Sequence, residues 1–319
     1  MVRSVALETR AASKLPYLDF VHEYVREIRP VVVKGAVANW PAMKLWTPQY
    51  FKDRYPAKRV QVSYTESMTF ADFIDGVLAS TNDNPGPYMY RLFIHEDMPE
   101  LLPDISPQNP YAFPRRYASP LMRTFWRRPD GYLKLLIGGI GGRFPVMHFD
   151  GENAHATVTE IHGEKEFVMY PPSDREYLYP DPAIPNKSLI RDPHTVDCER
   201  FPLQERATQY RAVLEPGDMV FIPCRWWHTA RALTPSISLG TNILDEANWR
   251  GFVREVARPK LAPKALLNRA YWEGAGLAMS MIEALQRFVP ALGHLAPNSS
   301  AATLDPSKRS FKIYRKEDA

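Results

Sequence analysis

The sequence predicts a mainly β protein, a sandwich or barrel of short strands with helices near both ends of the chain. Three observations support this class. From about residue 87 to about residue 245, short apolar runs alternate with Gly- and Pro-rich turns. Helical spacing of apolar residues is confined to the region before these runs and to the residues after Trp249. The 30 prolines favour many short segments over long helices.

The N-terminal region alternates helix and strand patterns. LDFVHEYVREI has helical apolar spacing and is followed by Pro30, which ends a helix. PVVVKG is a β-branched run closed by a turn glycine and predicts a buried strand. WTPQYFKDRY predicts a short helix with Thr47 as N-cap and Pro48 in the first turn. RVQVSY predicts a strand, and TFADFIDGVLAS predicts an amphipathic helix with a threonine cap.

The middle of the chain predicts strands in YMYRLFI, YLKLLIGG, ATVTEIHG, EKEFVMYPP, QYRAVLEPGD, MVFIPC, WHTARAL and SISLGTNIL. Residues 171–208 form a long Pro- and Asp-rich connection of a kind that is usually functional, often a lid. WRGFVREVA and the segment from APKALL to QRFV predict two helices, followed by a frayed basic tail. We therefore expect one main unit over residues 1–250 and a helical extension over residues 251–319.

Composition excludes several classes of protein. No run approaches ~18 uninterrupted apolar residues, and the first residues lack a signal-peptide core, so we expect no membrane association. Two cysteines, Cys198 and Cys224, predict a fold without structural disulfides in a reducing compartment, the cytoplasm. The net charge of +4 is concentrated near the C-terminus without interleaved aromatic residues, which favours a solvated tail over a nucleic-acid site.

A His-x-Asp motif is the first candidate site. PVMHFDGENAH places His148 and Asp150 two residues apart, and PGDMVFIPCRWWH places His228 late in the chain on a predicted strand. In an antiparallel barrel such positions can converge at one mouth. Two imidazoles and one carboxylate on one face of an octahedron leave three positions open, which suits non-heme Fe(II) enzymes. A second His-x-Asp, at His95 and Asp97, shows that the motif alone is not specific.

The order of several motifs carries a resemblance. HFD, GEKEFVMYPPSDREYLYP, ERFP, PGDMVFIPCRWWH and SISLGTN follow one another as in the JmjC-type, cupin-like Fe(II)/2-oxoglutarate hydroxylases. The sequence is most similar to the branch that contains asparaginyl and lysyl protein hydroxylases, and RPVVVKGAVANWPAMKLWTPQYF resembles the entry segment of that group. The resemblance covers roughly residues 15–250. It implies a double-stranded β-helix (jelly-roll, cupin) core for the catalytic unit over residues 1–250.

The resemblance also implies roles for individual residues. It makes His148, Asp150 and His228 the iron ligands. It gives His95 and Asp97 no role, because no GEK or WWH follows them at the distances of the family, and we expect both on the surface.

The co-substrate 2-oxoglutarate needs a cation for its distal carboxylate. Lys165 matches the family lysine that pairs with this carboxylate. Tyr90 matches a family tyrosine that hydrogen-bonds the same group, and Tyr88, which has the same parity on the predicted strand, is the alternative. Asn242 matches a family asparagine near the metal-bound carboxylate.

The sequence departs from the family pattern between His148 and Lys165, which are two residues further apart than in the nearest members. The extra residues lie in GENAHA, where the family usually has an asparagine that faces the co-substrate. Asn153 or His155 is the candidate for this contact, and the pattern does not choose between them. For His155, a hydrogen bond behind the ligands is favoured over direct coordination, which would occupy a position that dioxygen needs.

The predicted reaction is hydroxylation of a C–H bond, coupled to conversion of 2-oxoglutarate and O2 to succinate and carbon dioxide. By resemblance the substrate is a protein or peptide side chain, and an amino-acid-like small molecule remains open. A cupin-like module that binds a metal or ligand without turnover is the alternative. An apolar stripe runs along the C-terminal helix and predicts either packing onto its own domain or a homodimer. It comprises Leu266, Ala270, Leu277, Met281, Ile282, Leu285 and Phe288. The substrate, the hydroxylated atom and its stereochemistry are left open.

Overall fold

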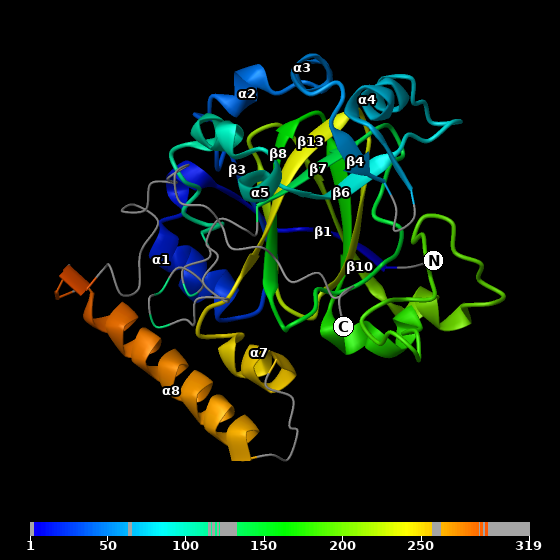
Figure 1. Cartoon of the computed structure of the whole chain (residues 1–319). Coiled ribbons are helices and arrows are strands. Elements are labelled where there is room, and N and C mark those ends of the chain that lie inside the picture. The colour runs from blue at the N-terminus through cyan, green and yellow to red at the C-terminus, as the bar shows by residue number, and fades with distance from the viewer. Residues whose placement is uncertain are drawn as a thin grey trace.

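The computed structural model describes residues 3–62, 66–113, 116, 119, 121, 133–256, 263–286, 288–289 and 291–292. Two large sheets form its centre (Figure 1). The first has seven strands in the order β2 (Thr9–Ala11), β3 (Val31–Lys34), β11 (Met219–Ile222), β8 (His155–His162), β13 (Ser236–Ile243), β7 (Lys134–Gly138) and β6 (Tyr88–Phe93). The second has four strands in the order β1 (Arg3–Ala6), β10 (Thr208–Leu214), β9 (Lys165–Tyr170) and β12 (Trp227–Ala232).

The two sheets share one interior. Ala156 and Val220 of the seven-stranded sheet pack in a cluster with Phe167, Met169 and Ala230 of the four-stranded sheet. Because side chains alternate along a strand, Ile161 of β8 belongs to a different cluster on the opposite face. The predicted double-stranded β-helix core with flanking helices is confirmed.

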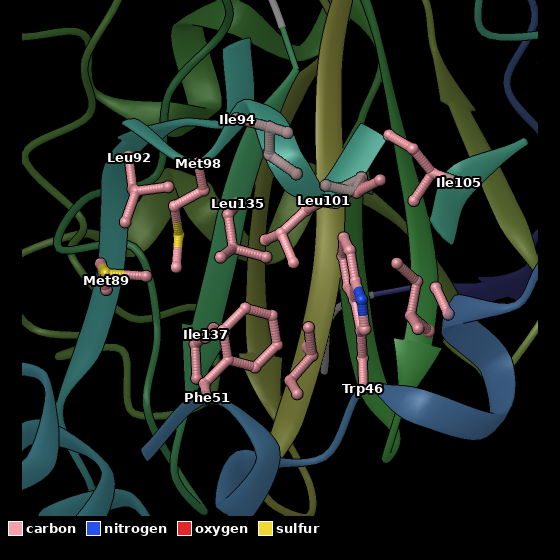
Figure 2. Packing of buried hydrophobic residues seen from close by; sticks show 14 of the residues in the cluster. Trp46, Phe51, Met89, Leu92, Ile94, Met98, Leu101, Ile105, Leu135 and Ile137 are labelled. Carbon is pink, nitrogen blue, oxygen red and sulfur yellow. The ribbon is translucent and has the colours of Figure 1, made fainter. Parts of the chain in front are cut away.

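The N-terminal helices cover the outer face of the seven-stranded sheet. They are α2 (Ala42–Leu45), α3 (Pro48–Arg54), α4 (Phe70–Leu78) and α5 (Ile94–Asp97), with a 3-10 segment at Pro99–Ile105. Figure 2 shows Phe51 of α3 beside Ile137 of β7, in a cluster whose members are almost fully buried. The predicted caps are confirmed, since Thr47 accepts a hydrogen bond from the Tyr50 amide and Thr69 from the Asp72 amide.

The first helix of the chain is short and changes its winding. An α-helical turn, α1 (Tyr17–Phe20), continues as a π-helical turn over Val21–Val25, which ends before Pro30 as predicted. A two-stranded ribbon joins β4 (Arg59–Gln61) to β5 (Ser67–Thr69), so the strand predicted in RVQVSY is shorter than expected, and residues 63–65 lie outside the described ranges.

The long connection over residues 171–208 contains two short 3-10 segments, Pro172–Leu178 and Pro202–Arg206. Its middle part pairs with the His-x-Asp segment: the Phe149 amide donates to the Asn186 carbonyl (3.0 Å), and the Ser188 amide donates to the Met147 carbonyl (2.9 Å). This part of the predicted lid therefore supports the backbone that carries the candidate metal ligands.

Two helices follow the last strand, as predicted. These are α7 (Trp249–Val256) and α8 (Pro263–Leu285), and α8 lies at the edge of the molecule (Figure 1). Trp272 and Met279 of α8 pack with Trp249 and Phe252 of α7. The frayed basic tail predicted at the C-terminus lies outside the described residues. Within the described ranges, every helix is too short or too polar to cross a bilayer.

Candidate metal centre and co-substrate pocket

The structure brings the three predicted iron ligands together. One ligand atom each of His148, Asp150 and His228 lies within 4.8 Å of the others, and Asp150 Oδ2 is 3.8 Å from His228 Nε2. The two histidines face each other across an antiparallel bridge: the His148 amide donates to the His228 carbonyl (3.1 Å), and the reverse bond is 2.7 Å. Strand pairing between the His-x-Asp segment and β12 therefore sets the distance between the two imidazoles.

Both imidazoles present the same nitrogen to the centre. His148 Nδ1 lies 3.1 Å from the Val146 carbonyl, and His228 Nδ1 lies 3.0 Å from the Trp226 carbonyl. A carbonyl can only accept, so each Nδ1 carries the proton and each Nε2 keeps its lone pair. Two neutral imidazole nitrogens and one carboxylate are the ligand types that non-heme iron takes, so the residues present fit this metal.

The charges of the triad also suit a cation. Burial, together with the neighbouring His228, lowers the pKa of His148 to about 3, which keeps its imidazole neutral. Burial opposes ionisation of Asp150, but the two histidines, Lys134 and a hydrogen bond from Asn242 outweigh it and lower the pKa of this carboxyl group. Asp150 is therefore a carboxylate, and the site holds one negative charge among its three ligands.

Two residues that the sequence analysis did not select also lie in the barrel. Lys134 Nζ donates to Asn242 Oδ1 (3.0 Å), which turns the Asn242 amide nitrogen toward Asp150. Glu160 lies on β8, opposite Ser238 of β13 in the strand register. Lys134 begins the otherwise apolar strand β7, and Glu160 is the one acidic residue of β8. That pattern is the sequence feature by which they could have been found.

Lys165 lies between the two sheets, inside the barrel. Its side chain is fully buried, and its ammonium group donates to Ser238 Oγ. The ring of Tyr88 stacks against the same ammonium group, with Nζ 5.6 Å from the ring centroid. Glu160 Oε2 is 3.6 Å from Nζ. The lysine predicted to hold the co-substrate is thus inside the barrel and not on a solvated strand face.

Of the two tyrosines, the structure places the alternative, Tyr88, next to Lys165. The Tyr90 ring instead contacts Phe144 (4.7 Å between centroids), and Phe144 contacts His148 (4.3 Å). Gly138 makes room for Tyr88, because a Cβ at this glycine would lie 2.6 Å from the tyrosine ring. Tyr90 therefore belongs to an aromatic wall beside the metal ligands, and Tyr88 to the lysine pocket.

The side chains of Asn153 and His155 lie outside the barrel interior, away from Lys165 and the metal ligands. His155 Nδ1 accepts from the Cys224 amide (2.8 Å) and Nε2 is 3.4 Å from Asp245 Oδ2. His155 shares the strand parity of Thr157, which lies on the face of β8 turned away from the barrel interior.

The Asn153 side chain is likewise engaged outside the barrel. Its amide donates to the Asn248 carbonyl (3.0 Å) and its oxygen accepts from Arg225 (2.8 Å). It also packs on Gly251, where a Cβ would lie 2.0 Å from the Asn153 amide nitrogen. The expected co-substrate contact from Asn153 or His155 thus has no counterpart in this arrangement: the extra residues of GENAHA attach β8 to the segment that follows β13.

Among the residues that the structure describes, the second His-x-Asp motif belongs to no group of metal-ligating side chains. His95 lies in α5 and is buried, contrary to the expectation of a surface position, and burial lowers its pKa to about 4. Asp97 is exposed, as expected, and its carboxylate accepts from the Phe93 amide (2.8 Å). Asp97 therefore caps a helical turn.

A jelly-roll barrel with two histidines and one carboxylate at its mouth defines the class of cupin-fold metal proteins. The chain belongs to the family described as "Cupin-like domain", whose match covers residues 17–253. The resemblance to the JmjC-type, cupin-like group is confirmed by relatives that carry this name, such as Jumonji C domain-containing protein 5 of Drosophila melanogaster, 32% identical over 103 residues. That alignment covers 32% of this chain and 25% of the relative.

Longer alignments link the chain to proteins with named activities. It is 27% identical over 231 residues to lysine-specific demethylase 8 of Xenopus tropicalis, covering 69% of this chain and 49% of that protein. It is 25% identical over 284 residues to the human bifunctional peptidase and (3S)-lysyl hydroxylase JMJD7, covering 71% of this chain and 85% of that protein. The chain spans about half the length of the demethylase relatives that it matches.

Proposed function

We propose that this protein is an Fe(II)/2-oxoglutarate-dependent dioxygenase that hydroxylates a C–H bond. The observation that carries the proposal is the convergence of His148, Asp150 and His228 within 4.8 Å in a barrel that also contains the buried Lys165. The triad alone would also suit a cupin-like module that binds metal without turnover. A buried cation at a second position in the same barrel favours an enzyme, since it provides for a co-substrate carboxylate.

Each residue of the proposed site has a separate role in the reaction. Bound Fe(II), with 2-oxoglutarate and O2, supplies the oxidising power for attack on the C–H bond. Lys165, with Ser238 and Tyr88 around its ammonium group, binds the distal carboxylate of the co-substrate. Asn242, held by Lys134, orients the Asp150 carboxylate toward the metal position. The rings of Phe144 and Tyr90 exclude water beside His148.

The substrate class that we propose is a protein or peptide side chain. The human relative named as a (3S)-lysyl hydroxylase supports this class, and the alignment covers 85% of that protein. An amino-acid-like small molecule is the second candidate. We place the catalytic unit at residues 1–250 and the helical extension at residues 251–319. The two free cysteines fit a reducing compartment such as the cytoplasm.

Succinate release tests the proposed function. Purified protein with Fe(II), ascorbate and 2-oxoglutarate is expected to form succinate, and a lysine-containing peptide library is expected to raise the rate and gain one oxygen (~16 Da, the mass of one oxygen atom). Lys165→Met is expected to weaken 2-oxoglutarate binding by at least ~30-fold, because a charge-assisted contact in a buried pocket is lost. Retained metal binding without any binding of 2-oxoglutarate would instead establish a non-catalytic module.

We also propose a homodimer through α8. The helix packs on its own chain through Trp272 and Met279, whereas the stripe predicted from the sequence stays largely exposed: Leu277 is 65% exposed and Met281 58%. Neighbouring apolar side chains exposed along one helix face mark an interaction surface. We propose that the partner is α8 of a second copy, because in a two-fold symmetric dimer the same surface of each subunit forms the interface.

The double variant Leu277→Glu, Met281→Glu is expected to shift the protein from dimer to monomer in light scattering after size exclusion. Both side chains are exposed, so the fold of the chain should be kept. Leu78→Glu, on α4, removes an apolar side chain that is 47% exposed and should leave the oligomeric state unchanged. A wild-type protein that is monomeric at micromolar concentration would refute the interface.

A further inference from the structure

A second charged group with an unusual environment lies beside Lys165. Glu160 is fully buried, and its carboxylate faces Lys165 and the Ser238 hydroxyl without a close, well-aligned hydrogen bond to any described residue. Oε2 lies 3.6 Å from Lys165 Nζ, beyond hydrogen-bond distance, and the lysine donates instead to Ser238 Oγ. A buried acid with such weak hydrogen bonding is costly unless it is protonated or gains a partner on ligand binding.

Lys165 is therefore not a free cation for an incoming anion. With Glu160 ionised, the pocket holds one positive and one negative charge, and a co-substrate carboxylate would enter beside another carboxylate. Two carboxylates that share a buried site do not both stay ionised, since the like charges raise the pKa of one of them. With Glu160 protonated, Lys165 supplies the charge, and the carboxylic acid can donate its O–H to the incoming carboxylate.

Glu160 is poised for this change. Burial raises the pKa of Glu160 to about 7, although Lys165 and the Ser238 hydroxyl oppose the shift. The other groups that face it are Tyr88 on β6, whose pKa burial raises above its ordinary value so that it stays neutral, and Asp218 before β11. Asp218 is paired with Lys34 at 2.6 Å. Glu160 is thus the group in this pocket that changes charge between pH 6 and 8.

We propose that Glu160 sets the pH range and the charge selectivity of the co-substrate pocket: binding of the distal carboxylate of 2-oxoglutarate at Lys165 requires Glu160 to take up a proton. This inference rests on the proposed function. The proton comes from solvent and forms the O–H bond of the Glu160 carboxyl group, and no other bond is made or broken. Above the pKa of free Glu160, each unit of pH should weaken 2-oxoglutarate binding by about tenfold.

The test is calorimetric titration of 2-oxoglutarate into the Mn(II)-loaded full chain, so that binding is measured without turnover. At pH 8, titrations in buffers of different ionisation enthalpy should show uptake of close to one proton for each 2-oxoglutarate bound. Glu160→Gln should take up none, and at pH 8 it should bind 2-oxoglutarate about tenfold more tightly than the wild type, because a neutral amide can donate to the carboxylate at every pH. At pH 6 the two affinities should converge.

Glu164→Gln is the matched control, because Glu164 is an exposed acid next to Lys165 and its replacement should leave the proton count unchanged. Binding by the wild type with no proton uptake at pH 8, or weaker binding by Glu160→Gln, would overturn the inference and leave the proposed function standing. The number of protons that the wild type takes up for each 2-oxoglutarate bound tests the inference even if the Glu160→Gln variant does not fold. Absence of 2-oxoglutarate binding at pH 6 and pH 8 in the Mn(II)-loaded wild type would overturn both.

Discussion

Replacing Asp150 with alanine is expected to abolish succinate release and to weaken metal binding by more than ~100-fold, beyond the ~10–100-fold typical of changing a hydrogen-bond partner of a ligand. Asp150 supplies the negative charge among the three ligands, and Asn242 and Lys134 hold its carboxylate. Metal content after dialysis against Fe(II) or Co(II), together with succinate release, measures the effect.

Asp97→Ala is the matched control, since it removes the aspartate of the other His-x-Asp motif. Asp97 caps α5 and lies in no group of metal-ligating side chains among the described residues. Metal content and turnover should stay at the wild-type level, with a stability loss of about 1 kcal/mol from the missing cap. Equal loss of metal in both variants would refute the assignment of the triad.

The second large effect concerns stability. Asp245→Asn is expected to lower the free energy of unfolding by about 3 kcal/mol at pH 6, which is the scale for removing one partner of a buried charge pair. His155 is completely buried, and its Nε2 is 3.4 Å from Asp245. Burial lowers the pKa of His155, but Asp245 and the Cys224 side chain outweigh burial and raise it to about 9. Protonation at pH 6 places a proton on Nδ1, so the imidazolium gives up the hydrogen bond that the neutral ring accepts from the Cys224 amide, and it keeps the pairing of Nε2 with Asp245.

The effect of Asp245→Asn should depend on pH in a defined direction. A histidine whose pKa is raised from 6.5 to about 9 on folding stabilises the fold fully below about pH 6.5, and this contribution is lost as the pH rises through 9. Asp245, whose pKa is lowered, contributes above its ordinary value of 3.8 and loses this contribution on acidification. Urea unfolding at pH 6 and pH 9.5 should therefore give a large difference between variant and wild type at pH 6 and a small one at pH 9.5.

Asp53→Asn is a control for this experiment, because Asp53 is exposed on α3 and its carboxylate accepts a hydrogen bond from the Gln49 side chain of the same helix. It should change the free energy of unfolding by no more than ~0.5 kcal/mol at either pH. A pH-independent loss in Asp245→Asn would show that the aspartate acts through its hydrogen bond to the Ala247 amide and not through His155.

Much of the fold and the triad could be predicted because both depend on short sequence patterns. Short apolar runs between Gly and Pro turns predict the strands, and the two histidines and Asp150 lie in motifs with fixed neighbours. The choice between Tyr88 and Tyr90 could not be made in this way. The two residues have the same parity on β6, and the register with β7 shifts between Met89 and Leu92, so only the three-dimensional pairing decides which ring meets Lys165.

Other parts of the site depend on contacts between strands that are distant in the sequence. Glu160 and Ser238 meet because β8 pairs with β13, and Lys165 reaches both from the opposite sheet. No local pattern contains this contact. His155 is a different case: it is close to His148 in the sequence, but it has the same strand parity as Thr157 along β8 and therefore lies on the outer face.

The pairing of the His-x-Asp segment with β12 has a consequence for assembly of the protein. His148 and His228 lie on two neighbouring backbones that meet through only a short bridge, at the place where the wall of the barrel closes. An ion held by both histidines would join these two edges, so the free energy of metal binding adds to the free energy that keeps the wall closed. Removal of such an ion should thus loosen this bridge, and metal supply would then influence the lifetime of the folded protein as well as the proposed catalysis.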